Sequence, residues 1–286
     1  MDFLFALILG IVEGLTEFLP ISSTGHLLVA SALLHFPPLV PPGLRITFDI
    51  FIQLGAVLAV IVYYGRDLLA QASRIPSDQS TQRFWLNILI AFLPAAIVGL
   101  LAKKWIDALT SGNGSLASLI IGVALVLGGI VFLIIERRPQ PANSAPTHPV
   151  GQIPQVTTRQ AFLIGLAQVV SLIPGVSRSG ATIVGGLLTG LDRVTATAFS
   201  FYLFIPTLGA ATVYSLYSAA KSGTLDTSQL PLLAVATVAA FIVSYASIAW
   251  LLRYVSSHSF RVFGIYRIIA GVIIIGLALF TPLLIG

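Results

Sequence analysis

Six apolar stretches, each long enough to cross a membrane, constrain this chain more than any other feature. They lie near residues 46–65, 84–103, 116–136, 196–220, 231–252 and 262–284. A membrane-spanning helix needs about 20 mostly apolar residues. Only 9% of the residues are charged, whereas soluble domains carry about 25%, so polar side chains are too few to cover a soluble surface. The pattern predicts an all-α integral membrane protein with about six full transmembrane helices.

The chain contains no cysteine, which excludes disulfides, thiolate metal sites and a cysteine nucleophile. Its formal net charge is +5, and most of the cations lie in short loops between the apolar stretches. Such loop charges set the orientation of membrane helices. The positive charge therefore does not indicate nucleic acid as a partner.

Two further apolar segments are interrupted in the middle by polar turn residues. The interruption is 20–26 (PISSTGH) within residues 1–36, and 174–180 (PGVSRSG) within residues 159–190. Each flanking arm is about half the length of a spanning helix. Because a broken helix at membrane depth is tolerated only where protein or a cavity surrounds it, we predict two re-entrant helix hairpins.

The two interrupted segments also match each other in sequence. A displacement of 155 positions places Gly10 on Gly165 and Ser22 on Ser177. Each half would hold one hairpin and about three spans, and an odd number of crossings inverts the second copy. We predict an inverted-topology repeat within one membrane domain, made of a first repeat over 1–138, a Pro-rich linker over 139–158 and a second repeat over 159–286.

Loop charge predicts an orientation for this repeat. One side holds Arg66, Arg74, Arg83, Arg137, Arg138, Arg159, Arg193, Arg253 and Arg261, and the other holds Arg45, Lys103, Lys104 and Lys221. The positive-inside rule places the first group in the cytoplasm. Both termini and the mouth of the first hairpin would then face outward. The second hairpin would open inward, with the two hairpin tips meeting near the midplane.

Two carboxylates lie within the first apolar arm. Glu13 and Glu17 are four residues apart, which places them on one face of a helix about one turn apart. An ionisable side chain inside a span costs at least about 2.5 kcal/mol, and the two like charges add repulsion. Either a shared divalent cation or one protonated carboxyl would relieve this repulsion.

The turn that follows is rich in hydroxyl groups. Ser22, Ser23 and Thr24 precede the second half-helix, where such side chains cap a helix or bind an oxyanion. His26 lies in the first turn of that half-helix and can exchange a proton near neutral pH. Together with the two glutamates, these residues form a candidate site.

The second hairpin offers an anion site at the matching position. Ser177, Arg178, Ser179 and Thr182 open its second half-helix, and a helix N-terminus presents free N–H groups and a positive dipole end. The Arg178 guanidinium has a planar fork that suits phosphate oxygens. Arg178 could at the same time act as an internal counter-ion to Glu13 or Glu17.

Three other polar residues near apolar stretches are weaker candidates. Asp49 and Gln53 could support the site, although a purely structural role is slightly preferred for both. Arg267, about one turn into the last stretch, is expected to extend its side chain to the cytoplasmic interface.

The two motifs resemble those of a known family. Residues 13–26 (EGLTEFLPISSTGH) and 174–182 (PGVSRSGAT) are similar to the two signatures of the bacterial undecaprenyl-diphosphatases, also called bacitracin-resistance proteins. The resemblance extends over nearly the whole chain, including 48–60 and 199–206, and is weakest in the linker. It implies hydrolysis of undecaprenyl diphosphate to the monophosphate and phosphate, which recycles the lipid carrier for cell-wall synthesis.

The resemblance further implies dependence on a divalent cation, Mg²⁺ or Ca²⁺, and a location in the bacterial inner membrane. The active site would be reached from the periplasmic side. The implied partners are the polyprenyl diphosphate and membrane lipid, with a homodimer left as an alternative to the monomer. By motif position, the expected functional residues are Glu13, Glu17, Ser23, His26, Ser177, Arg178 and Thr182.

Two mechanisms and one competing function remain open from the sequence. In the first mechanism Ser23 attacks the terminal phosphorus while His26 handles its proton, Arg178 clamps phosphate oxygens, and Glu13 and Glu17 hold the metal. In the second, His26 or Glu17 activates water and Ser23 is a ligand. Without the motifs, inverted repeats with broken helices would indicate a secondary transporter or lipid flippase.

Overall fold

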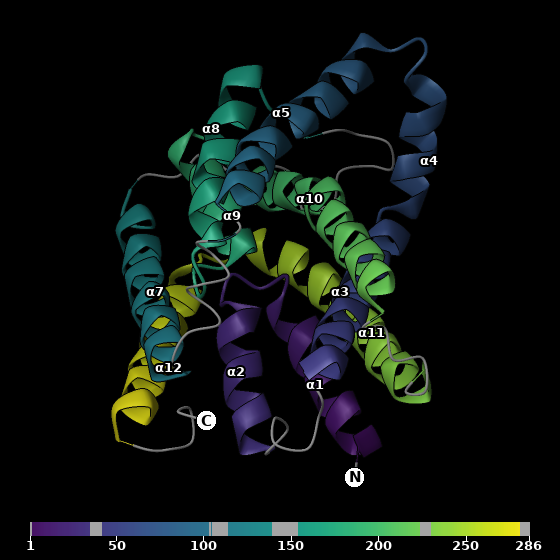
Figure 1. The fold of residues 1–286 in the computed structure, drawn as a ribbon. Helices are drawn as coiled ribbons and strands as arrows, with labels where there is room; N and C mark the ends of the chain where they lie inside the picture. Colours follow the sequence, from purple (N-terminus) through teal and green to yellow (C-terminus); the bar gives the residue numbers. More distant parts are fainter. Residues whose placement is uncertain are drawn as a thin grey trace.

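The computed structural model describes residues 2–34, 42–102, 104, 114–138, 154–223 and 230–280. Every secondary-structure element in these ranges is a helix (Figure 1), which confirms the all-α class. The helices are α1 (Asp2–Thr16), α2 (Ser23–Leu33), α3 (Pro42–Tyr63), α4 (Gly65–Arg74), α5 (Gln79–Leu101), α7 (Gly114–Ile135), α8 (Thr158–Val169), the short 3₁₀ helix η1 (Val170–Leu172), α9 (Arg178–Leu188), α10 (Arg193–Ser222), α11 (Leu230–Val255) and α12 (Arg261–Phe280).

Both predicted hairpins are present. The arms α1 and α2 have 15 and 11 residues, and α8 and α9 have 12 and 11. At about 1.5 Å per residue, none reaches the roughly 30 Å of a bilayer core. Figure 1 shows α1 and α2 in the lower half of the molecule and α8 and α9 in the upper half, with the connecting turns close together in the middle.

Five helices in the described part of the chain are long and apolar enough to cross a membrane, namely α5, α7, α10, α11 and α12. The pair α3 and α4, which are bent by 63° where they meet, counts as a sixth candidate if the pair is one span. With this pair counted, the prediction of about six spans is confirmed. The pair also includes α4, which extends beyond the apolar stretch predicted at 46–65. The bend follows from Tyr64, which leaves helical geometry at φ −89° and ψ 9°. The Gln71 side chain then anchors α4 by donating to the Tyr202 hydroxyl at 3.0 Å.

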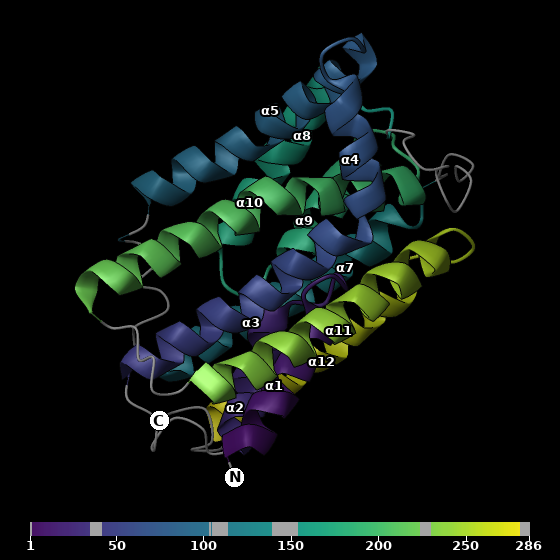
Figure 2. The same ribbon diagram turned by 90° about the vertical axis from the view of Figure 1, so that its right-hand side faces the viewer.

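The helices pack in reciprocal pairs. Helix α1 lies against α11 and α8 lies against α5, while α3 contacts α10 and α7 contacts α12. Figure 2 shows α10 between α5 and α3. These pairings are compatible with the inverted repeat, which stays a prediction, as do the two repeat boundaries. The linker predicted over 139–158 lies outside the described residues except for 154–158.

Small residues permit the closest of these contacts. A Cβ on Gly10 of α1 would lie 2.5 Å from the Ala236 carbonyl oxygen of α11, and one on Gly165 of α8 would lie 2.6 Å from the Ala91 oxygen of α5. Close helix approach through glycine is the usual packing device in membranes, where lipid competes equally for apolar side chains. Gly10 and Gly165 are the pair matched by the 155-residue displacement, and both bring a hairpin arm against a spanning helix.

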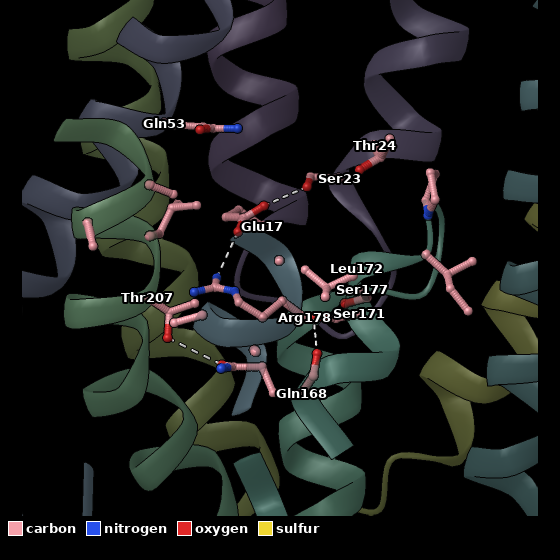
Figure 3. Close-up of a pocket in the computed structure, with 18 of the residues that line it drawn as sticks. Glu17, Ser23, Thr24, Gln53, Gln168, Ser171, Leu172, Ser177, Arg178 and Thr207 are labelled. Atoms are coloured by element: carbon pink, nitrogen blue, oxygen red, sulfur yellow. Dashed lines mark hydrogen bonds and ion pairs between the residues drawn. The ribbon is translucent and has the colours of Figure 1, made fainter. Parts of the chain in front are cut away.

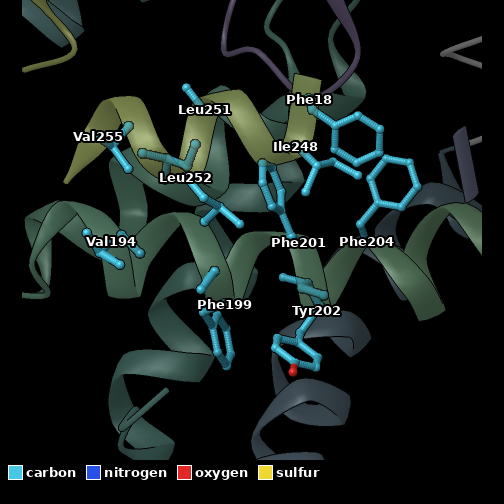
Figure 4. Packing of buried hydrophobic residues seen from close by; sticks show 14 of the residues in the cluster. Phe18, Val194, Phe199, Phe201, Tyr202, Phe204, Ile248, Leu251, Leu252 and Val255 are labelled. Atoms are coloured by element: carbon cyan, nitrogen blue, oxygen red, sulfur yellow. The ribbon is translucent and has the colours of Figure 1, made fainter. Parts of the chain in front are cut away.

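An aromatic cluster supports the tip of the first hairpin from behind. Phe18 is completely buried, and its ring centroid lies 5.3 Å from that of Phe201 and 4.7 Å from that of Phe204. Figure 4 shows these rings packed beside Ile248 of α11. Aromatic side chains bury a large area in few rotamers. The cluster therefore fixes the backbone next to Glu17.

Candidate active site

The site lies where the two hairpin turns meet. Each turn ends on a serine with a left-handed backbone, Ser22 at φ 72° and Ser177 at φ 66°. These are the only such non-glycine residues in the described part of the chain, and they are the pair matched in sequence. A side chain in this region costs on the order of 1–3 kcal/mol, and such strain is concentrated at functional sites. Both turns thus adopt the same costly conformation directly before their second arm.

Glu17 connects the two hairpins chemically. Its Oε1 accepts from the Arg178 guanidinium at 2.8 Å, and its Oε2 accepts from the Ser23 hydroxyl at 2.5 Å (Figure 3). The Arg178 Cζ atom lies 3.8 Å from the centre of the Phe204 ring, which holds the guanidinium from one face. A carboxylate, a cation and a hydroxyl from three helix ends therefore meet at one point.

A side chain of the second turn also contacts the backbone of the first turn. The Ser179 hydroxyl lies 3.3 Å from the Glu17 carbonyl oxygen and 3.2 Å from that of Leu19. The Ser177 hydroxyl accepts from the Gly180 amide at 3.1 Å and so caps α9, and its predicted role in binding phosphate stays a prediction. Ser22 lines the cavity described next, and its buried hydroxyl has no hydrogen-bond partner among the described residues. Its predicted role in binding phosphate stays a prediction.

A cavity of about 600 Å³ opens in front of Glu17 and Arg178. Six of the sequence-predicted residues line it, namely Glu17, Ser22, Ser23, Thr24, Ser177 and Arg178. Its other walls are largely apolar and come from α5, including Phe92 and Ala96, and from α10, including Leu208 and Ala211. Gln168 and Thr207 also line it, 3.3 Å apart, and the sequence analysis missed both. The cavity combines a polar end with an apolar passage.

Of the four predicted residues that do not line this cavity, three have partners elsewhere, and Glu13 lines the cavity described next. Ser179 is buried between the turns, and the Thr182 hydroxyl donates to carbonyl oxygens of its own helix, at 3.0 Å to Arg178 and 3.2 Å to Ser179. His26 places Nδ1 2.8 Å from the Ser22 carbonyl oxygen and Nε2 2.6 Å from the Tyr266 hydroxyl, stacked on that ring. The structure brings Ser23 to Glu17, and a role of His26 in proton transfer stays a prediction.

Glu13 lines a second, smaller cavity of about 250 Å³, which shares Ser23, Thr24 and Gln53 with the first. Its Oε2 is buried and has no hydrogen-bond partner in the part of the chain that the structure describes. Asp49 lines the same cavity, so the two residues that the sequence offered as support for the site, Asp49 and Gln53, are both in the walls. No group of three or more His, Cys, Asp or Glu that could hold a metal occurs among the described residues.

These residues nevertheless fit a hard divalent cation that completes its shell with other oxygens. The cavity offers two carboxylates together with amide and hydroxyl oxygens, and contains no sulfur or nitrogen ligand. Mg²⁺ commonly binds through one or two carboxylates, several waters and substrate phosphates. Glu13 is the best placed of the two predicted metal ligands, because Glu17 already accepts from Arg178 and Ser23.

Arg267 corrects an expectation from the sequence. Its side chain does not extend to the interface but is 1% exposed, and it donates to the carbonyl oxygens of Pro20 in the first turn and Val176 in the second. Carbonyl oxygens in the turns have no partner within a helix, and here they accept from the guanidinium in place of water. The charge of Arg267 can therefore be buried in the protein. The apolar pattern around Arg267 carries no sign of these distant carbonyls.

Comparison with known proteins identifies the family. The family model described as bacitracin resistance protein BacA matches residues 6–273. The chain belongs to this family. A relative from Albidiferax ferrireducens named undecaprenyl-diphosphatase is 45% identical over 273 residues, covering 96% of this chain and 94% of the relative. One from Deinococcus radiodurans with the same name is 42% identical over 280 residues, covering 96% and 95%. Both sequence motifs and both hairpin turns lie within residues 6–273.

Proposed function

We propose that this chain is an undecaprenyl-diphosphatase, which hydrolyses undecaprenyl diphosphate to undecaprenyl phosphate and inorganic phosphate. The observation that carries the proposal is the Glu17 carboxylate bonded to both Arg178 and Ser23 at the polar end of an apolar-walled cavity. An anionic headgroup on a long apolar chain is complementary to such a cavity. The names of relatives that cover nearly the full chain support the same substrate. The product is the lipid carrier for cell-wall synthesis, and its recycling accords with the bacitracin resistance in the family description.

The chemistry assigned to these side chains is phosphoryl transfer. The Arg178 guanidinium binds oxygens of the terminal phosphate and offsets the charge that builds up on them. Ser23 Oγ attacks the terminal phosphorus while its proton passes to Glu17 Oε2, which already accepts from it at 2.5 Å. The bond from phosphorus to the bridging oxygen breaks, and undecaprenyl phosphate leaves. Water then hydrolyses the phosphoserine to release phosphate and restore Ser23.

The alternative is direct attack by water, with Glu17 as the base and Ser23 as a ligand of the substrate. Both routes use the same residues and give the same products. They differ in whether a covalent intermediate forms, which the Ser23 prediction in the Discussion decides.

A divalent cation bound at Glu13, Mg²⁺ or Ca²⁺, would neutralise diphosphate charge that Arg178 alone does not balance. We expect Glu13→Gln to raise the Mg²⁺ concentration for half-maximal hydrolysis by about tenfold, because one anionic ligand is lost. A metal titration of the purified protein measures this. Asp67→Asn on α4, outside both cavities, is the control and should leave the titration unchanged. An unchanged titration in Glu13→Gln would contradict the metal role.

We infer that the site is reached from the periplasmic side of the inner membrane. The cavity is lined by the second halves of α5 and α10, at 92–100 and 207–215. These halves lead toward Lys104 and Lys221, on the side with fewer cations, which the positive-inside rule places outside. All residues in the proposal belong to one chain, and a homodimer stays a prediction.

Phosphate release from undecaprenyl diphosphate by the purified protein in detergent tests the proposed function. We expect release that depends on the protein and on a divalent cation. The competing function, a transporter or flippase with an anion site at the midplane, predicts binding or lipid movement without release. Absence of release under conditions where the substrate binds would overturn the phosphatase assignment.

The apolar walls of the cavity predict selectivity for long prenyl chains. We expect Ala96→Phe to lower kcat/KM for undecaprenyl diphosphate by about tenfold, because the ring occupies space that the chain would use. A short prenyl diphosphate should lose less than about threefold in the same assay, since it reaches the polar end without filling the passage. Ile97→Phe is the matched control, because Ile97 is adjacent but 53% exposed on the outer face of α5. An equal loss for both substrates would contradict this use of the passage.

A further inference from the structure

Arg267 on α12 is a buried cation that the proposed reaction does not use. It is 1% exposed, and it forms no ion pair within the part of the chain that the structure describes. A charge at membrane depth without a counter-ion costs several kcal/mol unless polar groups solvate it. A buried charge at Arg267 therefore requires several hydrogen-bond acceptors around its guanidinium.

Those partners are backbone carbonyl oxygens from three separate segments. Nη1 donates to Pro20 at 3.0 Å, in the first hairpin turn. Nη2 lies 3.4 Å from the oxygen of Gly175 and 3.2 Å from that of Val176, in the second turn. On α7, Nε lies 3.4 Å from the Leu125 oxygen and Nη2 3.3 Å from that of Ala124.

The two turns bonded in this way are those that carry the reacting groups. Pro20 lies between Glu17 and Ser23, and Val176 lies two residues before Arg178. One planar guanidinium with donors in fixed directions thus sets the distance between the turns from behind the site. The Ser179 hydroxyl, close to the carbonyl oxygens of Glu17 and Leu19, is a further link between the two turns.

The neighbouring helix is shaped to admit the guanidinium. Gly128 and Gly129 of α7 face Arg267, and a Cβ on Gly128 would overlap the guanidinium group, while one on Gly129 would lie 3.1 Å from the Arg267 Cβ. A Cβ on Gly180, in the first turn of α9, would lie 3.2 Å from Nη1. Glycine at these three positions therefore leaves the space that the Arg267 side chain occupies.

We propose that Arg267 is a positioning residue, which holds the two hairpin turns at the separation where Glu17, Ser23 and Arg178 meet the diphosphate together. The proposal rests on the proposed function for its kinetic consequence, but its structural part does not. Displacement of a reacting group by about 1 Å costs on the order of 100-fold in rate, so a modest loosening of the turns has a large effect.

The test combines kinetics with a distance measurement. Arg267→Met keeps the length of the side chain and removes the donors, and it should lower kcat by about 100-fold with KM changed less than about threefold. Arg267→Lys keeps the charge but has no planar fork, so it should recover only part of the loss. Arg253→Met, at an exposed arginine of α11, is the control and should retain wild-type kcat. Folding of each variant is checked by helical circular dichroism and size-exclusion chromatography.

The separation of the hairpins is measured with spin labels, which the absence of native cysteine makes straightforward. Leu15 on α1 and Leu166 on α8 are 48% and 45% exposed and line neither site cavity, so Leu15→Cys with Leu166→Cys reports the two hairpins. We expect the distance distribution to broaden in Arg267→Met and to stay unchanged in Arg253→Met. Gly128→Ala, which displaces the guanidinium while keeping the arginine, should broaden it as well and serves if Arg267→Met does not fold.

A folded Arg267→Met protein with wild-type kcat overturns the proposal, and so does a lower kcat with an unchanged distance distribution. The spin-label distance measurement does not require that the protein hydrolyses its substrate. If the wild-type protein released no phosphate, the proposed function would fail, while the spin-label distances would still decide whether Arg267 sets the separation of the turns.

Discussion

Replacement of Arg178 by alanine is expected to reduce kcat/KM for undecaprenyl diphosphate by about 10³-fold or more, the range seen when a cation that stabilises transferring phosphate is removed. Arg178 is the cation that lines the cavity, and its side chain is held by Glu17 at 2.8 Å and by the Phe204 ring at 3.8 Å. A loss of this size corresponds to about 4 kcal/mol of transition-state stabilisation. When Arg178 is replaced, none of the described residues that line the cavity is a cation. Arg267 also remains buried, but its donors are directed to backbone carbonyls.

Arg193→Ala is the matched control for this experiment. Arg193 forms a comparable ion pair with Glu136 at 2.6 Å, and its side chain is 17% exposed against 14% for Arg178, but it lines no part of the cavity. Its loss should lower the thermal stability and leave kcat nearly unchanged. Each variant is assayed after size-exclusion chromatography confirms that it is folded. Turnover in Arg178→Ala above about a tenth of the wild-type value would remove Arg178 from the proposed role.

Replacement of Ser23 by alanine is expected to reduce kcat by about 10³-fold or more, because loss of a nucleophile removes the covalent route. Ser23 is the first residue of α2, and its hydroxyl is the one bonded to a carboxylate in the cavity. In the wild-type protein, rapid quenching in acid during turnover should trap a phosphoserine at this position. Mass spectrometry of the quenched protein identifies the modified residue.

Ser200→Ala controls for the loss of a buried hydroxyl, because Ser200 is 6% exposed and donates only within α10, to Ala196 at 2.8 Å. It should leave turnover unchanged. Retained activity in Ser23→Ala together with no trapped phosphoserine would favour direct attack by water, with Glu17 as its base. Such a result would leave the hydrolase assignment intact and change only the mechanism.

Much of the fold could be predicted because the bilayer imposes strict limits on length and polarity. A helix that crosses about 30 Å of hydrocarbon must show a long apolar run, and α5, α7, α10, α11 and α12 all do. The two hairpins were predictable for the converse reason, since their arms are apolar but too short. The bend between α3 and α4 was not, because it depends on the backbone of Tyr64 and on the contact between Gln71 and Tyr202.

The sequence predicted which residues form the site better than it predicted which of them bond to one another. Glu17, Ser23 and Arg178 were identified from residue type and from their place beside helix breaks. One of the two mechanisms open from the sequence paired Ser23 with His26, whereas the structure places Ser23 at Glu17 and His26 at Tyr266 of α12. On a helix, His26 lies three residues beyond Ser23 and near the same face, but a contact with another helix decides its partner, because its ring stacks on Tyr266 and its Nε2 lies 2.6 Å from that hydroxyl.

The sequence by itself determined that this chain is a helical membrane protein with two polar turns, and which residue types those turns contain. Those properties are local, since each follows from the apolar length or polarity of a continuous segment. Only the tertiary structure decided that the turns share one carboxylate, that α5 and α10 wall the cavity, and that Arg267 bonds both turns from behind. These contacts join residues up to 247 positions apart, and they depend on helix packing that no local pattern records.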